Sequence, residues 1–173
     1  MFLKIVSSIS IVVCCTLLGI HMSNRYDRRI YNIRVLQSIL INLETEIVYY
    51  STLLSQAIRN STRNLEGDWK NFFLEVADIL EYKKDCSFAE VWKETLQGIK
   101  NCPYIGKGEL DIMYRFGLQL GNSDRLSQRK YFEIAQQQLK TEEKNALQLH
   151  FRYGKMYRSL GLLLGLGIAI ILL

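Results

Sequence analysis

Both ends of this chain are free of charge, whereas the middle is polar. Residues 5–20 contain no charged side chain, and neither do residues 159–173. An apolar helix needs about 20 residues, or roughly 30 Å, to cross a bilayer. Residues 3–22 reach that length, with Lys4 able to extend to the interface. The second stretch gives only about 22 Å and either crosses a thinned bilayer or stops short. The sequence therefore predicts a transmembrane anchor over residues 1–23 and a hydrophobic membrane anchor over residues 159–173.

Each end also has an alternative interpretation. The first segment could be a cleaved signal peptide, but no small-x-small cleavage site follows it, and a basic cluster comes after it. The residues before Cys14 and Cys15 are not small, which argues against a lipoprotein signal. The second segment could be a buried core helix, although fifteen successive uncharged residues favour an anchor. We therefore expect membrane lipids to contact both ends.

The net charge of +5 is unevenly distributed. Residues 25–34 carry four basic side chains and one acid, and residues 152–158 carry three basic side chains and no acid, so each stretch has a charge of +3. Residues 35–151 carry 14 Lys/Arg against 16 Asp/Glu, a net charge of −2. Because basic residues beside an apolar segment mark its cytoplasmic side, residues 24–158 are expected to face the cytoplasm. A nucleic-acid-binding protein would carry its basic patch on the folded domain, so no nucleic acid is expected as a partner.

The middle of the chain has the periodicity of amphipathic helices. Apolar residues recur at steps of three and four, and Pro103 is the only proline. The stripes cover residues 33–54, 69–80, 88–99, 110–120 and 132–160, with another short helix around residues 53–63. The first stripe continues from the N-terminal anchor or breaks near residues 23–24, and the last runs into the C-terminal anchor. The sequence predicts an all-α antiparallel helical bundle.

Local signals mark the ends of several helices. Asp68 is a plausible N-cap. Ser87 and Glu90 have the spacing of a capping box, in which a hydroxyl and a carboxylate each accept a hydrogen bond from a free backbone N–H group. Gly121 followed by Asn122 is a typical helix end. Trp92, which follows the capping box, is expected in the bundle core.

No pattern in the sequence is typical of catalysis, cofactor binding or metal binding. His21 and His150 lack a suitably spaced partner for zinc and are expected at a surface or interface. Residues 106–108, Gly-Lys-Gly, are too short for a phosphate-binding loop and are expected to form a turn. We expect no catalytic, cofactor-binding or metal-binding residue, and we expect that the chain is not an enzyme.

The chain has four cysteines, Cys14, Cys15, Cys86 and Cys102, and no CxxC motif. Buried cysteine behaves as a small hydrophobic residue, which is the role expected for all four. A disulfide between Cys86 and Cys102 would need an oxidising compartment, which the expected cytoplasmic location argues against.

Gly161 and Gly165 give the second apolar segment a GxxxG spacing. Small residues four apart let helices approach closely. These glycines could pack against the first anchor, against a second copy of the chain in a homo-oligomer, or against another protein. The spacing could also reflect only the glycine-rich composition of the segment.

Three stretches resemble the stage III sporulation protein AB family of endospore-forming bacteria. They are residues 116–125 (FGLQLGNSDR) with Gln128, residues 155–161 (KMYRSLG) before the apolar tail, and residues 36–49 around LETEI. The resemblance extends to the size of the chain and to an anchor at each end. Many relatives have a proline in the turn after the first long helix. Here Thr52 and two leucines replace it, so the position of that break is not fixed by the resemblance.

The resemblance implies a middle domain like the type II secretion F domain of membrane platform proteins. It also implies a non-catalytic platform subunit, required for endospore formation, in a secretion-like channel apparatus between mother cell and forespore. The partners would be other subunits of that apparatus, including its cytosolic secretion-type ATPase. The location would be the outer forespore membrane, on the mother-cell side.

The candidate structural or interaction residues combine the family stretches with local chemistry. Glycines end and pack helices, and Asp124 can cap the next helix. Acids around the loop at Pro103, which include Glu109 and Asp111, are candidates for contact with a basic patch on the ATPase, and a solvated rim is the alternative. The candidates are Phe116, Gly117, Gly121, Asn122, Asp124, Glu90, Glu94, Gly161 and Gly165.

Two other function classes stay open. A membrane-tethered helical signalling or adaptor protein would require a long continuous coiled coil, which the interruptions between residues 52 and 121 argue against. A membrane enzyme would require a cluster of titratable residues at one end of the bundle, and the sequence shows none.

Overall fold

The computed structural model describes residues 2–82, 86–120, 125–154, 156, 159–160, 163–164, 167–168 and 170. Side chains are described for these residues except 2–9, 11, 125 and 126. The chain divides into two compact units, Tyr31–Lys144 and Met1–Ile30 with Asn145–Leu173. We call the first the helical domain and the second the paired ends.

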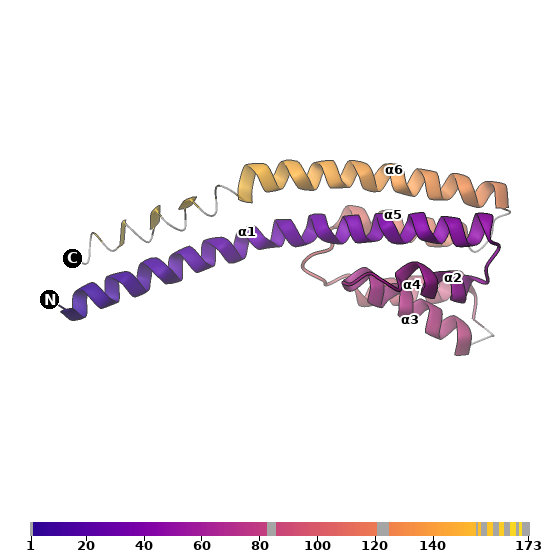
Figure 1. The fold of residues 1–173 in the computed structure, drawn as a ribbon, viewed down its shortest axis with the longest axis horizontal. Helices are drawn as coiled ribbons and strands as arrows, with labels where there is room; N and C mark the ends of the chain where they lie inside the picture. Colours follow the sequence, from indigo (N-terminus) through magenta and orange to yellow (C-terminus); the bar gives the residue numbers. More distant parts are fainter. Residues whose placement is uncertain are drawn as a thin grey trace. The chain divides into compact units, whose positions relative to one another are not determined.

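The described secondary structure is entirely helical, which confirms the predicted all-α class (Figure 1). Two of the α-helices continue into a short π-helix. Helix α1 is followed by the π-helix Thr45–Tyr49, and helix α6 by the π-helix His150–Gly154. The six α-helices are α1 (Phe2–Glu44), α2 (Leu54–Thr62), α3 (Asp68–Tyr82), α4 (Phe88–Gly98), α5 (Lys107–Leu120) and α6 (Arg125–Leu149).

A column of aromatic rings forms the centre of the helical domain and joins four helices. Edge-on contacts link the rings of Phe72 and Trp92 at 4.9 Å and those of Phe116 and Phe132 at 4.9 Å, and the Trp92 and Phe116 centroids lie 5.9 Å apart. All four side chains are buried. Such aromatic pairs contribute about 0.5–1.5 kcal/mol beyond the area that they bury. The column therefore connects α3, α4, α5 and α6 through a single core.

Polar contacts fix the direction of α6 against α1 within the helical domain. Glu143 of α6 accepts hydrogen bonds from Arg34 Nε at 2.7 Å and Gln37 Nε2 at 3.2 Å. Further along α1, Glu44 accepts a hydrogen bond from Gln136 Nε2 at 2.8 Å. Later residues of α1 thus contact earlier residues of α6, so this pair is antiparallel, as the sequence predicts.

The first long helix ends differently from the expectation that one apolar stripe reaches residue 54. Ser51 has a φ angle of 56°, a left-handed conformation that cannot continue an α-helix. The Thr52 hydroxyl donates to Glu46 Oε2 at 2.7 Å, and its N–H donates to Glu46 O at 3.0 Å. The left-handed residue and these two bonds form the turn. Tyr50 is consequently exposed, and Leu54 begins a new helix.

A buried polar contact joins α1 to the start of α3 and to the loop between α4 and α5. Asn32 Nδ2 donates to Asp68 Oδ2 at 3.2 Å and to Tyr104 O at 3.3 Å. Cys102 Sγ also lies 3.2 Å from Asp68 Oδ2. Burial, partly offset by a backbone hydrogen bond, raises the pKa of the Cys102 thiol, and the Asp68 carboxylate adds to the rise. Asp68 is therefore the first residue of α3, and its carboxylate links α3 to Asn32 of α1 and to Cys102 of the loop after α4. The sequence predicted only that Asp68 is the N-cap of a helix.

The paired ends contain close contacts of their own. The rings of Tyr26 and Tyr153 stack with centroids 6.4 Å apart, and His150 Nδ1 lies 3.3 Å from Asp27 Oδ1. Ser23 is buried, and a Cβ atom added to Gly154 would lie 3.3 Å from its hydroxyl. The segment just before the helical domain and the segment just after it therefore lie side by side within this unit.

Within the part of the chain that the structure describes, no helix combines the length and the apolar character needed to cross a membrane. Much of residues 159–173 lies outside the described residues, and both anchors stay predictions from the sequence.

Candidate interaction surface

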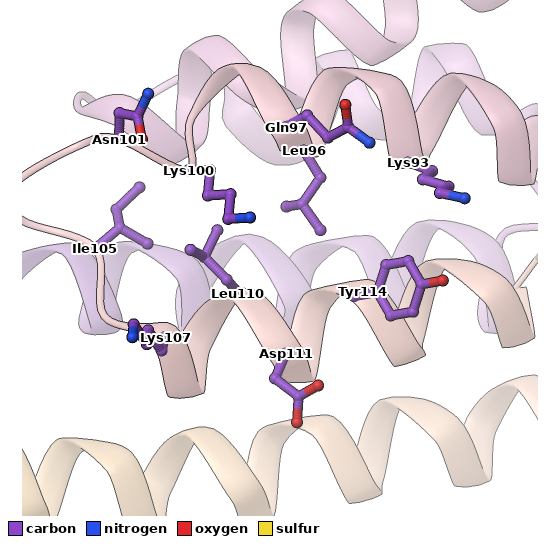
Figure 2. Close-up of a pocket in the computed structure, with 10 residues that line it drawn as sticks. All are labelled: Lys93, Leu96, Gln97, Lys100, Asn101, Ile105, Lys107, Leu110, Asp111 and Tyr114. Carbon is purple, nitrogen blue, oxygen red and sulfur yellow. The ribbon is translucent and has the colours of Figure 1, made fainter.

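A groove of about 770 Å³ lies between α4 and α5 and the loop that joins them (Figure 2). Its floor is apolar, because Leu96 and Ile105 are 6% and 8% exposed and Leu110 is half-buried. Polar and charged side chains surround this floor. The complete lining is Lys93, Leu96, Gln97, Lys100, Asn101, Ile105, Lys107, Leu110, Asp111 and Tyr114.

The helix packing explains which side chains of α4 reach the groove. Val91, Trp92 and Thr95 face the core. Leu96 lies at the edge of this buried face, and its side chain extends toward α5 in Figure 2. Lys93 and Gln97 come one residue after core positions and are exposed. The boundary between the buried and exposed faces of α4 therefore becomes one wall of the groove.

Three lysines give the groove its charge. Lys93, Lys100 and Lys107 are exposed, and none forms an ion pair with a described carboxylate. The only acid in the lining is Asp111, whose Oδ2 lies 2.6 Å from Arg115 Nη2. The charge of this acid is therefore already compensated, and the groove is electropositive.

Gly117 and Phe116, two candidates from the family stretch, lie in the core. Phe116 is 2% exposed. A Cβ atom added to Gly117 would overlap the Trp92 indole ring. The indole Nε1 donates to Met113 O at 2.8 Å, which fixes the ring against α5. Gly117 thus lets α4 and α5 approach closely, in agreement with the expectation that the glycines pack helices.

The other family candidates cannot be located. Gly121, Asn122 and Asp124 lie outside the described residues, and so do Gly161 and Gly165. Their predicted roles in ending, capping and packing helices stay predictions.

Of the four acids near Pro103, Glu90, Glu94 and Asp111 are exposed, whereas Glu109 is buried. Glu109 is only 1% exposed, and its carboxylate accepts a hydrogen bond from the Gly106 N–H group at the start of α5. Glu90 accepts a hydrogen bond from Ser87 N, and the Ser87 hydroxyl accepts one from Glu90 N, so the predicted capping box is confirmed. The expectation of accessibility is therefore wrong for Glu109, whose carboxylate is turned to the Gly106 N–H group and not to solvent. A charge reversal at Glu90 would also open the cap, so Glu94 gives the cleaner test of an ATPase contact.

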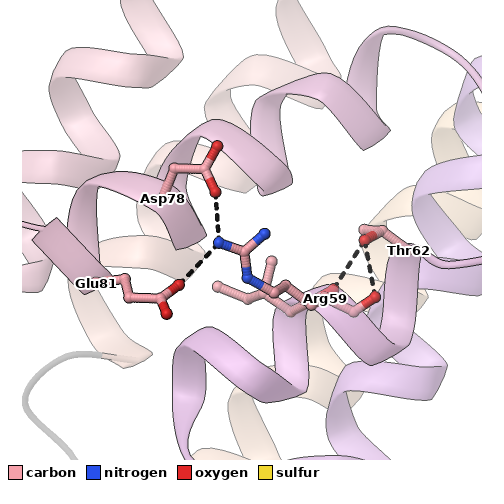
Figure 3. A network of polar contacts seen from close by, with 5 residues as sticks. Arg59, Thr62, Asp78 and Glu81 are labelled. Carbon is pink, nitrogen blue, oxygen red and sulfur yellow. Dashed lines mark hydrogen bonds and ion pairs between the residues drawn. The ribbon is translucent and has the colours of Figure 1, made fainter.

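An exposed ion-pair network between α2 and α3 was not predicted from the sequence (Figure 3). Arg59 Nη2 lies 2.8 Å from Glu81 Oε2 and 2.6 Å from Asp78 Oδ1. The guanidinium donates hydrogen bonds to the Glu81 and Asp78 carboxylates, which raise its pKa. The two acids are three residues apart and so share one face of α3. Nothing in the sequence indicates that Arg59 faces them.

The described cysteines and titratable residues suggest neither a disulfide nor a metal site. Cys14, Cys15, Cys86 and Cys102 are free, and Cys14 and Cys86 are exposed rather than buried as expected. Among the described residues, no group of His, Cys, Asp or Glu could hold a metal ion.

The described part of the chain is all-helical, and the groove between α4 and α5 has an open, charged rim. Residues 4–173 match the family model described as stage III sporulation protein AB. The chain belongs to the stage III sporulation protein AB family.

Two relatives show how far the similarity extends. The chain is 32% identical over 171 residues to stage III sporulation protein AB of Bacillus subtilis (strain 168), which covers 99% of each chain. A solved structure of stage III sporulation protein AB matches with a TM-score of 0.66 and 30% identity, covering 71% of this chain and 96% of the other. Both the sequence and the helical fold therefore agree with the family.

Proposed function

We propose that this chain is a non-catalytic membrane platform subunit of a secretion-like channel apparatus between mother cell and forespore, required for endospore formation. It is attached to the outer forespore membrane by both ends, with the helical domain in the mother-cell cytoplasm. Its partners are membrane lipids and other subunits of the apparatus, among them the cytosolic secretion-type ATPase. The membership of the family supports the sporulation role.

The observation that carries the proposal is the side-by-side arrangement within the paired ends. Tyr26 stacks on Tyr153, and Ser23 lies against Gly154. The uncharged stretches of the sequence come directly before and shortly after these contacts. A domain whose two flanking segments lie side by side can enter one membrane face with both ends, and the basic residues at 25–34 and 152–158 suit the cytoplasmic headgroups.

A deletion and a fractionation test the two parts of this proposal. The gene is deleted in its host and then restored in trans. We expect the count of heat-resistant spores to collapse on deletion and to recover with the restored gene. We expect the chain to stay in the membrane pellet after an alkaline carbonate wash and to be released by detergent. Normal spore counts without the gene, or release by carbonate alone, would contradict the proposal.

A further inference from the structure

The electropositive groove between α4 and α5 has an exposed rim whose lysines take no part in the core of the helical domain. Leu96 and Ile105 at its base belong to the core and are almost fully buried, whereas the half-buried Leu110 and the exposed Tyr114 present apolar surface to the groove (Figure 2). An open apolar floor surrounded by charge is typical of a surface that binds another protein.

At least two of the three lysines lie at positions where their charge does not stabilise a helix. Lys107 is the first residue of α5, where the helix dipole disfavours a positive charge. Lys93 is exposed in the middle of α4 and has no described carboxylate partner. Lys100 follows the end of α4, where its charge is compatible with the dipole. At least two of the three positive charges therefore have no stabilising partner within the described chain.

The arrangement of the charges suits an elongated acidic ligand. Lys93 lies within α4, Lys100 lies two residues after the end of α4, and Lys107 lies across the groove at the start of α5. An amphipathic helix in a groove places apolar side chains on the floor and polar side chains at the rim. Carboxylates on the polar face of such a helix would meet the lysines at the rim of the groove.

We infer that the groove binds an acidic amphipathic helix of a partner protein, with apolar side chains on Leu96, Ile105 and Leu110 and carboxylates at Lys93, Lys100 and Lys107. This inference deepens the proposed function and rests on it, because it assigns the surface through which the subunit holds a partner of the apparatus. The negative ligand follows from charge complementarity with three uncompensated lysines.

The test measures binding of a defined peptide to the full chain in phosphatidylcholine nanodiscs. The probe is a fluorescein-labelled helix of about four turns, or ~15 residues, with leucine at steps of three and four and glutamate at the flanking positions. Fluorescence anisotropy gives the dissociation constant, with empty nanodiscs as the blank. We expect saturable binding that weakens as salt is raised. A peptide with lysine in place of every glutamate should not bind.

Groove variants and a matched control decide whether the site is the one inferred. Joint replacement by Lys93→Glu, Lys100→Glu and Lys107→Glu should weaken binding by about tenfold or more, and the corresponding glutamine variant should give an intermediate loss. The control reverses the exposed lysines of α6 by Lys130→Glu, Lys140→Glu and Lys144→Glu, with the same change in net charge. Equal weakening in both sets, or unchanged binding to the groove variant, would overturn the inference.

Two further measurements separate the competing outcomes. Soluble dioctanoyl phosphatidylglycerol is the lipid probe, and its lysine-dependent binding without peptide binding would overturn the inference in favour of a membrane contact. Thermal unfolding of each variant checks that the domain stays folded. If the peptide fails to bind while spore counts still depend on the gene, only this inference is wrong. Normal spore counts without the gene would instead refute the proposed function, whatever the peptide does.

Discussion

At the scale of the residue, the contact between Gly117 and Trp92 explains why a glycine lies in the middle of α5. Glycine in a helix costs up to about 1 kcal/mol relative to alanine. Here the missing side chain leaves room for the indole, which packs on Phe72 and Phe116 and donates a hydrogen bond to Met113 O. The packing and this bond offset the lower helix propensity.

Replacing Gly117 with alanine should therefore destabilise the protein although alanine is the better helix former. The new methyl group would overlap the Trp92 ring, and overpacking of this kind costs about 1–3 kcal/mol. Chemical denaturation of the variant gives the loss in the free energy of unfolding. The control is Gly98→Ala at the end of α4, where nothing lies within 4 Å of the added Cβ atom. A similar loss in both variants would show that the contact with Trp92 is not the cause.

At the scale of the helix, the ion pair between Arg34 and Glu143 makes the α1–α6 contact sensitive to acid. The hydrogen bond from Arg34 lowers the pKa of Glu143 from 4.5, and Gln37 contributes in the same direction while burial opposes it. A lowered pKa in the folded state means that the folded protein holds the proton less tightly than the unfolded chain. The resulting stabilisation is fully present above about pH 4.5 and is lost as the pH falls through the lower folded value.

The variant Glu143→Gln should accordingly be less stable than the parent at neutral pH, and the difference should close below about pH 4.5. The loss should be about 1 kcal/mol or less, because the Arg34 side chain is 59% exposed. Urea denaturation across a pH series measures it. Glu133→Gln, which removes an exposed i,i+4 pair with Arg129 within α6, is the control. A gap between parent and Glu143→Gln that does not change with pH would rule out the ion pair as its source.

At the scale of the whole molecule, the chain consists of a helical domain with its own aromatic core and of paired ends. All six α-helices, α1 to α6, contribute residues to the core of the domain. The contacts of the paired ends come instead from residues 23–27 and 150–154. In the proposed platform subunit, the helical domain has its own core and the paired ends attach the chain to the membrane.

A designed disulfide tests the arrangement of the paired ends. In a chain without its four native cysteines, Ser23→Cys and Gly154→Cys should form an intramolecular bond. The Ser23 hydroxyl oxygen, whose place the new sulfur at position 23 would take, lies only 3.3 Å from the position of a Gly154 Cβ atom, and a disulfide needs side chains this close. Non-reducing electrophoresis after mild oxidation reports the faster-migrating crosslinked monomer. Chains with only one of the two cysteines should not show it. Its absence from the double variant would mean that the two segments are apart.

The sequence alone determined the helical class and most helix positions, because those depend on local periodicity and on capping residues close in the chain. The Ser87–Glu90 capping box and the buried Trp92 were predicted in this way and are confirmed. The sequence also revealed the family, because its stretches at residues 36–49, 116–125 and 155–161 are specific.

Only the tertiary structure decided features that depend on contacts between distant residues. The close packing of Gly117 against Trp92 brings together residues that are 25 positions apart and lie on two helices. The burial of Glu109 follows from the fold of its loop. The turn at Ser51, which follows α1 and its π-helix, depends on hydrogen bonds that Thr52 makes to Glu46. The groove likewise exists only because α4 and α5 pack together, which places Lys93 and Lys107 on opposite sides of one apolar floor. Periodicity indicates which face of a helix is buried, but not which residues of another helix it will meet.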